Sequence, residues 1–327
     1  MKAILLKKFG TADNLYLGEL DTPRPKPFEL LVKVHATALN RADIMQRKGQ
    51  YPPPPGASPI LGLEIAGTVT EIGKSIKKWK VGDKICGLLS GGGYAQYAVI
   101  PESLALPIPT NFSFEEAAAI PEVFLTAFQS INWIGKLKKG ETILIHAGAS
   151  GVGTAAIQLA KHLGATVYIT ASAGKHKVCR DLGADQTIDY KKENFEEKIH
   201  QITNGRGVDV IIDFIGAPYF QKNINCLTLD GRLILLGVMG GINVEDLNIL
   251  NLLTKRIQIS GSTLRSRSLE YRTRLTADLH KSTWSLFENK SIQPIIDKVF
   301  DWKDTIAAHK YMEANLNTGK IILRVDP

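Results

Sequence analysis

The sequence of 327 residues contains little cysteine and no long apolar run. Its three cysteines, Cys86, Cys179 and Cys226, are odd in number and far apart, which argues against a disulfide framework and favours a reducing compartment. No stretch reaches the roughly 18 consecutive apolar residues of a membrane-spanning helix. The amino terminus, MKAILLKKFG, has no signal-peptide pattern. We therefore expect a cytoplasmic protein that does not contact a membrane.

Aromatic residues make up only 7% of the chain, and they do not interleave with any dense basic run. The net charge of +8 could attract nucleic acid, a membrane surface or an anionic ligand. Without a basic stripe, a nucleic-acid partner is not favoured. The apolar fraction of 44% is that of an ordinary globular protein, and the length allows two domains.

The first third of the chain reads as a β-rich domain. Within residues 1–112, short alternating segments such as LLVKVHA are separated by proline- and glycine-rich turns such as TPRPKP and YPPPPGASP, a pattern typical of an antiparallel, barrel-like block. Ser113 and Glu116 then have the spacing of a capping box at a helix start.

Beyond this point, strands alternate with helical segments. Six apolar strands are predicted, at 142–147, 166–171, 186–189, 208–214, 232–238 and 256–262. Such a pattern indicates a parallel sheet covered by helices on both faces, the Rossmann type of doubly wound α/β fold. A polar helical region follows, and the strand 318–325 is expected to return to the first domain. We expect a first, discontinuous domain of residues 1–118 and 267–327, and a second domain of residues 119–266.

A glycine-rich turn joins the first of these strands to its helix. The segment HAGASGVGTAAIQLAK holds three glycines in six positions. Glycines at this place let a dinucleotide pyrophosphate approach the backbone and let the helix pack closely on the strand, and the amide groups of the helix start bind phosphate. The residues expected to do so are Ala149, Ser150, Gly151, Val152 and Gly153.

The residues at the end of the second strand indicate which dinucleotide binds. A carboxylate here usually holds the ribose of NAD, but this chain continues as ASAGKHK, without an acid. A hydroxyl and an ammonium suit a 2′-phosphate. Ser172, Gly174 and Lys175 therefore predict NADPH as the cofactor, although Lys175 and Lys177 could also be ordinary solvated residues of a helix start.

The segments GETILIHAGASGVGTAAIQLAK, GGGYAQYAVIP, AAAIPEVFLTAFQ and KYMEANLNTGKIIL resemble the quinone oxidoreductases of the medium-chain dehydrogenase/reductase superfamily. The resemblance runs essentially end to end, and it is closest to the p53-inducible quinone oxidoreductase subgroup. It implies a GroES-like catalytic domain beside the Rossmann domain, reduction of quinones by NADPH, and a homodimer.

The same resemblance implies the residues of the site. Asn40 and Tyr51 match positions at the nicotinamide end of the cleft, where Asn40 could hold the cofactor or a substrate oxygen and Tyr51 could position the quinone or supply a proton. Either residue could instead be structural, as a turn cap or an aromatic on a rigid loop. Further cofactor contacts are implied for Thr126, Tyr190, Gly216, Met239, Gly240, Ser262, Leu264 and Asn317.

No metal site is expected. Zinc-dependent relatives place a cysteine near Arg41 or Ala42 and a His-Glu pair at the position of Leu63-Glu64, and this chain has LNRAD and GLE there. Nothing else supplies the three or four spaced ligands that zinc needs.

Three functions stay open. A quinone accepts a hydride readily and needs mainly positioning and stabilisation of the developing oxyanion, so an NADPH-dependent, zinc-independent quinone reductase is the leading hypothesis. Reduction of the activated double bond of an enal or enone needs the same geometry. A non-catalytic NADPH- or RNA-binding protein is the third alternative.

Overall fold

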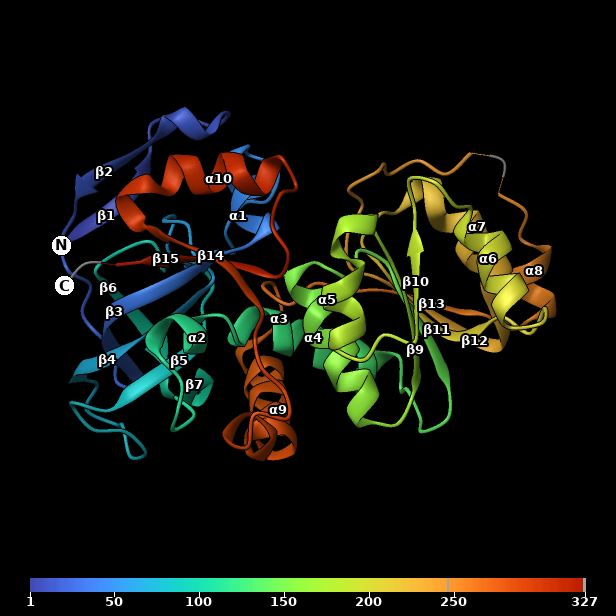
Figure 1. Cartoon of the computed structure of the whole chain (residues 1–327). Helices are drawn as coiled ribbons and strands as arrows, with labels where there is room; N and C mark the ends of the chain where they lie inside the picture. The colour runs from blue at the N-terminus through green and yellow to red at the C-terminus, as the bar shows by residue number, and fades with distance from the viewer. Residues whose placement is uncertain (246, 326–327) are drawn as a thin grey trace. The chain divides into compact units, whose positions relative to one another are not determined.

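The computed structural model describes residues 1–245 and 247–325, and the chain folds as two compact units (Figure 1). The first unit contains Met1–Leu125 and Leu264–Pro327, and the second contains Thr126–Thr263. The second unit is thus inserted, as one continuous segment, into the sequence of the first.

The first unit is built on a mostly antiparallel sheet around the long strand β3 (Glu29–Leu39). The strand order is β14-β15-β3-β4-β5-β7. β6 pairs with the first part of β3, residues 29–33, and β15 pairs with its last part, residues 36–39. Only the β14–β15 pair is parallel. A separate hairpin contains β1 (Lys2–Leu6) and β2 (Leu15–Glu19). The remaining strands are β4 (Glu64–Ile72), β5 (Lys84–Leu88), β6 (Tyr97–Pro101), β7 (Ala105–Pro107), β14 (Ile296–Asp301) and β15 (Lys320–Arg324).

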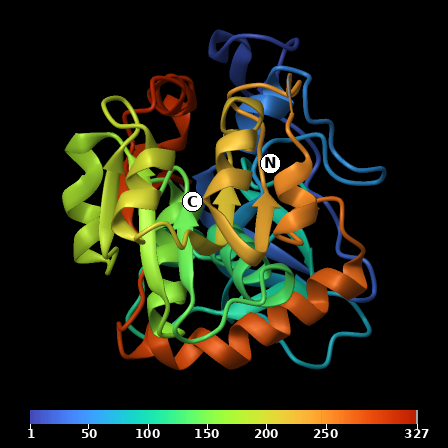
Figure 2. The same cartoon turned by 90° about the vertical axis from the view of Figure 1, so that its right-hand side faces the viewer.

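Two helices of the first unit, α2 and α9, begin at serine side-chain caps. At α2, the Ser113 hydroxyl accepts a bond from the Glu116 amide (3.2 Å) and the Glu116 carboxylate accepts one from the Ser113 amide (2.7 Å), so the capping box is confirmed. Ser268 caps α9, the long orange helix in Figure 2. The helices are α1 (Arg41–Arg47), α2 (Phe114–Ala118), α9 (Leu269–Glu288) and α10 (Thr305–Glu313), and α3 (Pro121–Phe128) crosses the boundary between the units.

The second unit contains a six-stranded parallel sheet with the order β10-β9-β8-β11-β12-β13. Helices α4 and α5 lie on one face of it, and α6, α7 and α8 on the other (Figure 1). The strand order reverses between β8 and β11, where open α/β sheets bind their ligands. The strands are β8 (Thr142–Ile145), β9 (Thr166–Ala171), β10 (Gln186–Asp189), β11 (Val208–Asp213), β12 (Leu227–Leu235) and β13 (Gln258–Gly261). The helices are α4 (Gly151–His162), α5 (His176–Asp181), α6 (Phe195–Ile202), α7 (Ala217–Cys226) and α8 (Leu250–Thr254).

The expected fold class is confirmed, since one unit holds a parallel, helix-covered sheet and the other a mostly antiparallel one. Two elements differ from the prediction. β12 begins at Leu227, because Leu227 pairs with Val208 of β11, and the polar, turn-like residues Thr228–Gly231 lie at a shift in register before Arg232 pairs with Val210. β14 lies in the region expected to be helical. In the described part of the chain, no helix combines the length and apolarity needed to cross a membrane.

Candidate active site

The glycine-rich turn leads from β8 into α4. The Ser150 hydroxyl caps the helix by accepting a bond from the amide of Gly153 (3.1 Å). A Cβ at Gly153 would lie 2.5 Å from the carbonyl oxygens of Ala147 and Gly148, and one at Gly148 would lie 2.6 Å from Ile169. These two glycines are therefore required by the protein's own packing, which seats the start of the helix against the turn. Ala149, Gly151 and Val152 complete the turn at the first residues of α4.

The second and third strands of the unit end side by side. Ala171 of β9 pairs with Asp189 of β10, so Ser172 and Tyr190 leave neighbouring strands at the same edge of the sheet. Tyr190 is 46% exposed, and Lys175 ends a short 3-10 helix that begins at Ala173. A Cβ added at Gly174 would meet no atom within 4 Å. This edge has open space and carries a hydroxyl, a phenol and an ammonium.

Gly216, Met239 and Gly240 are brought together beyond the ends of β11 and β12. The Met239 amide donates to the Phe214 carbonyl (3.1 Å), and the Gly240 amide donates to the Ile215 carbonyl (2.8 Å). Gly216 has a φ of +84°, and a Cβ there would lie 2.8 Å from the Gly241 carbonyl. A groove of about 600 Å³ opens here, lined by Ala217, Pro218, Gly240, Gly241, Ile242, Asn243 and Glu245.

The other predicted cofactor contacts are divided between the units. Ser262, in the second unit, accepts a bond from the Gln129 side chain (3.0 Å) on its hydroxyl. The carbonyl of Thr126 accepts from the Ser130 hydroxyl (2.7 Å) in the same unit. Leu264 and Asn317 belong to the first unit. Leu264 is buried, and the Asn317 side chain donates to the Gly319 carbonyl (2.8 Å), as a turn-capping residue does.

A buried polar chain that the sequence did not predict lies at the switch point of the sheet. Asp213, the last residue of β11, accepts bonds from the amide of Ile215 (2.6 Å) and the Asn223 side chain (3.0 Å). The Asn223 oxygen accepts from His146 Nε2 (2.7 Å), and Nδ1 of that ring contacts the Thr170 hydroxyl (3.0 Å). Burial lowers the pKa of His146 to about 4, so the ring is neutral at pH 7 and Nδ1 accepts. This chain joins β8, β9, β11 and α7.

In the first unit, Asn40 lies in a buried charged cluster. The ammonium of Lys320 on β15 donates to the Asn40 oxygen (2.6 Å), to Glu64 Oε1 (2.7 Å) and to the Leu39 carbonyl (3.1 Å). The Asn40 amide nitrogen donates to the same Glu64 oxygen (2.8 Å), and the Glu122 amide donates to Glu64 Oε2 (2.8 Å). The side chains of Lys320 and Glu64 are 3% and 0% exposed, so the charges neutralise each other away from water.

Asp43 forms a second buried acidic position beside this cluster. It accepts bonds from the amides of Asn40 (2.8 Å) and Gly62 (2.9 Å). Burial raises the pKa of Asp43 to about 6, although these bonds and the nearby charges of Lys320 and Arg265 oppose the shift. Asp43 thus fixes the start of α1 and the loop that ends at Gly62.

Tyr51 lies under a guanidinium that the sequence did not single out. Arg265 is 5% exposed, and its guanidinium carbon stands 5.4 Å from the centre of the Tyr51 ring, a cation–π geometry. Its Nε donates to the Ser90 carbonyl (2.9 Å). Tyr51 is partly exposed, and burial raises the pKa of its hydroxyl. Three segments far apart in sequence, around residues 51, 90 and 265, therefore meet at one place.

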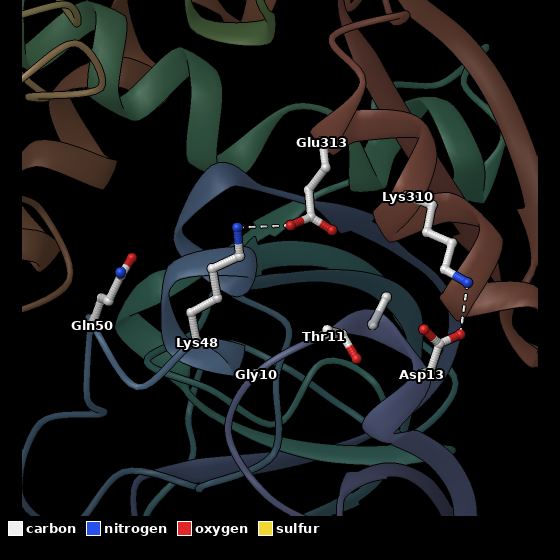
Figure 3. Close-up of a pocket in the computed structure, with 8 residues that line it drawn as sticks. Gly10, Thr11, Asp13, Lys48, Gln50, Lys310 and Glu313 are labelled. Atoms are coloured by element: carbon white, nitrogen blue, oxygen red, sulfur yellow. Dashed lines mark hydrogen bonds and ion pairs between the residues drawn. The ribbon is translucent and has the colours of Figure 1, made fainter.

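A separate charged pocket of about 520 Å³ lies between the helices α1 and α10 and the loop around Gly10 (Figure 3). Its four charged side chains form two ion pairs, Lys48 with Glu313 (2.8 Å) and Lys310 with Asp13 (2.6 Å). Because its charges are already paired and it contains none of the predicted site residues, this pocket is not the candidate active site.

No group of three or more His, Cys, Asp or Glu side chains within residues 1–245 and 247–325 has the geometry to hold a metal ion. The three cysteines are buried and separate. Glu64, the carboxylate at the position of a zinc-ligand pair in zinc-dependent relatives, is held by Lys320, Asn40 and the Glu122 amide.

The two units match two family models. Residues 26–110 match the alcohol dehydrogenase GroES-like domain, and residues 151–280 match the zinc-binding dehydrogenase model. Quinone oxidoreductase from Sus scrofa is 31% identical over 99% of this chain and 97% of its own length. The chain belongs to the medium-chain dehydrogenase/reductase superfamily. Its two units are thus the GroES-like and Rossmann domains of this superfamily.

Other relatives in the superfamily differ in what their names state. Phenolphthiocerol synthesis polyketide synthase type I from Mycobacterium bovis is 33% identical over 96% of this chain, which spans only 14% of that protein; the chain spans 14–19% of the first polyketide synthases that it matches. Among solved structures, the CurK enoyl reductase has a TM-score of 0.89 at 27% identity, covering 99% of both chains. A mycobacterial protein solved with NADPH has a TM-score of 0.89 at 28% identity, covering 99% of this chain and 100% of its own.

Proposed function

We propose that this protein is an NADPH-dependent, zinc-independent reductase of quinones, allied to the p53-inducible quinone oxidoreductase subgroup. The observation that carries the proposal is the state of Glu64. Both of its carboxylate oxygens already accept bonds from protein donors, and the buried Lys320 ammonium stands 2.7 Å from one of them. A cation at this place would be repelled by Lys320, and burial keeps the thiol of the nearby Cys86 protonated by raising its pKa, so it does not offer a thiolate. The chemistry that fits is hydride transfer to an acceptor that needs no Lewis acid.

The residues of the second unit fit a bound NADPH. The amides at the start of α4 would bind the pyrophosphate, since the helix begins after a turn in which no side chain protrudes at Gly148 or Gly153. Ser172, Lys175 and Tyr190 would surround the 2′-phosphate at the open edge of β9 and β10, where the residue after β9 is a serine and not a carboxylate. The groove beside Gly216 and Gly240 would receive the part of the cofactor that is farther from the 2′-phosphate, near Met239.

When bound, NADPH supplies a hydride, which carries two electrons and one proton. The acceptor would take one further proton from water, so that a quinone and NADPH would be converted to a hydroquinone and NADP⁺. The chain's own contribution is to hold the acceptor and to stabilise the oxygen that becomes negative. We assign Tyr51 the role of holding the acceptor, because its ring is partly exposed and fixed by the guanidinium above it.

Asn40 has a more restricted role. Both hydrogens of its amide are directed at protein acceptors, Glu64 at 2.8 Å and the Ala38 carbonyl at 3.4 Å. A substrate or nicotinamide oxygen would take one of these hydrogens only in exchange for such a bond, and the longer one to Ala38 is the weaker. Asn40 is therefore proposed to act through that second hydrogen, while the first keeps Glu64 and Lys320 in place.

A second function is favoured by the comparisons. The CurK enoyl reductase and the polyketide synthases are similar along nearly the whole of this chain, and reduction of an activated carbon–carbon double bond also ends on an oxyanion, the enolate. The decisive experiment follows NADPH oxidation with ortho-quinones, para-quinones, 2-alkenals and simple ketones under identical conditions. Turnover of quinones above alkenals supports the proposal, and alkenals above quinones favours the second function. Metal analysis of the same preparation should find no stoichiometric zinc, and one tightly held zinc per chain with turnover of alcohols would overturn both.

We also propose that the protein is a homodimer formed through the edge strand β13. This strand ends the sheet order of the second unit, and it presents Ile259 at 37% exposure, with Ile249, Leu250 and Leu253 of the neighbouring α8 region still more exposed. An apolar edge of this kind pairs readily with a symmetry mate.

A further inference from the structure

Two arginines of the first unit share an unusual environment. Arg265 donates through Nε to the carbonyl of Ser90 (2.9 Å), and Arg272 of α9 donates through Nη1 to the hydroxyl of the same Ser90 (2.8 Å). Both guanidinium groups therefore converge on one residue of the SGGG loop. Neither forms an ion pair with a carboxylate in the described part of the chain, in contrast to the paired cations Lys48 and Lys310 of the pocket in Figure 3.

Each of these guanidinium groups also keeps a donor without a partner. Arg265 Nη2 and Arg272 Nε are buried and make no hydrogen bond. An unsatisfied buried donor costs roughly 1–3 kcal/mol, and more when it is charged. Native proteins keep buried polar groups paired. Two neighbouring guanidinium groups with unpaired donors and no carboxylate partner are therefore suited to bind a negatively charged ligand.

The acidic side chain that acts on Arg265, Asp43, does not supply that charge. Asp43 lies close enough to Arg265 to affect its pKa, but the carboxylate oxygens of Asp43 accept bonds from the amides of Asn40 and Gly62. Arg265 instead faces the ring of Tyr51, which is the partly exposed side of this cluster. An anion resting against Tyr51 would therefore reach the guanidinium from the side that carries the proposed substrate position.

We propose that Arg265 and Arg272 form an anion site that receives the negatively charged oxygen of the acceptor as it is reduced. The inference rests on the proposed function, and it names the class of ligand: a phenolate or enolate, the oxyanion left when a hydride reaches a quinone or an enone. A guanidinium keeps its charge at every physiological pH, so it can stabilise this oxygen without giving up a proton, and the proton then comes from water. Tyr51 holds the ring of the acceptor, and Arg265 holds its oxygen.

The test measures binding and not turnover. 4-Nitrophenolate is the probe, and 4-nitroanisole, its neutral methyl ether, is the matched ligand; both are titrated calorimetrically into wild type and into Arg265→Gln and Arg272→Gln, at a pH where the phenol is ionised. Arg274→Gln is the control, because Arg274 is an exposed arginine of the same helix α9. A hydrogen bond to a charged group contributes roughly 1.5–3 kcal/mol, so phenolate affinity should fall by about tenfold or more in Arg265→Gln.

The ether should bind equally to all of these proteins, and Arg274→Gln should bind the phenolate as wild type does. If Arg265→Gln does not fold, Arg265→Lys, which keeps the charge but loses the planar fork, should show a smaller loss. Added guanidinium ion should restore phenolate binding to Arg265→Ala.

Equal affinity for phenolate and ether in wild type, or unchanged phenolate affinity in both arginine variants, would overturn the proposal. The acceptor panel separates it from the proposed function. If the protein reduces quinones and its affinity for phenolate is the same in wild type and in both arginine variants, the anion site alone is refuted. Arginine-dependent phenolate binding by a protein that reduces no acceptor refutes the proposed function alone.

Discussion

Replacing Lys320 by methionine should destabilise the first unit by about 3 kcal/mol. The ammonium makes three bonds, to the Leu39 carbonyl, to Asn40 and to Glu64, and methionine fills a similar volume without them. The substitution leaves the Glu64 carboxylate buried without its counter-charge, and breaking a buried pair in this way costs roughly 3–5 kcal/mol. Because Glu64 keeps two donors, the Asn40 side chain and the Glu122 amide, we expect the lower end of this range.

Urea unfolding followed by tryptophan fluorescence suits the measurement. Three of the four tryptophans, Trp79, Trp284 and Trp302, belong to the first unit, and urea does not screen charges as guanidinium chloride does. Lys310→Met is the matched control, because it removes an exposed ion pair whose partners Lys310 and Asp13 are 56% and 62% exposed. Such pairs contribute at most about 1 kcal/mol.

The pH dependence gives the sharper test. Lys320→Met removes a positive charge that lowers the pKa of Asp43, which burial raises to about 6. Ionised Asp43 is therefore less stable in the variant, so the deficit of Lys320→Met relative to wild type should be larger at about pH 8 than at about pH 5. Wild type is measured at each pH, because Asp43 also titrates there, with the charge of Lys320 still in place. The double variant Lys320→Met/Glu64→Gln should recover most of the loss. A deficit that does not change with pH, or a double variant as unstable as the single one, would refute the reasoning.

Four further outcomes are expected. Lys175→Ala should lower kcat/KM for NADPH by about tenfold and leave kcat/KM for NADH unchanged, since one hydrogen bond to a phosphate contributes roughly 1.5–3 kcal/mol. Lys177→Ala, which removes an exposed ion pair with Asp181, should leave kcat/KM unchanged for both cofactors. Tyr51→Phe should lower kcat less than about tenfold while Tyr51→Ala also raises KM, and a loss of the 10²–10⁴-fold typical of general acid catalysis would contradict the positioning role. Gly153→Ala should destabilise the second unit by about 1–3 kcal/mol in urea, because the new methyl group meets two carbonyl oxygens at 2.5 Å; Gly174→Ala, where a Cβ meets nothing within 4 Å, should be neutral. Light scattering at micromolar concentration should return twice the chain mass of 35.8 kDa, and a monomer would remove the proposed β13 interface.

The sequence predicted best those features whose causes are local. The glycine-rich turn, the capping box of Ser113 and Glu116 and the apolar strands of the second unit all depend on residues a few positions apart. The start of β12 was missed because Thr228–Gly231 has the composition of a turn, and Leu227 before it becomes part of the strand only by pairing with Val208 of the neighbouring strand β11. β14 was missed because IDKVFD has a mixed, largely exposed pattern, which local periodicity does not distinguish from a polar helix.

The polar residues of the site that could not be predicted from the sequence have hydrogen-bond partners far away in the chain. Lys320 and Glu64 are 256 positions apart, and Arg265 contacts Ser90 across 175 positions. A lysine before the apolar segment IILRV reads as the exposed start of a strand, and only the antiparallel pairing of β15 with β3 brings it to Asn40 and Glu64. His146 could have been suspected from its place between an apolar strand and the glycine-rich turn, but Asn223 and Asp213 carry no such signal.

The insertion of the second unit into the first has a consequence for synthesis on the ribosome. Thr126–Thr263 is a continuous segment, so its whole sheet emerges before β15 does and can form early. β3 must wait, because residues Ala36–Leu39 pair with β15, which is translated after the whole second unit. The 256 residues that separate Glu64 from Lys320 take about 13–50 s at roughly 5–20 residues per second. During that interval, the nascent chain exposes an unpaired strand edge and an uncompensated carboxylate. The amino-terminal sheet is therefore most exposed to chaperones and to aggregation before β15 has been synthesised.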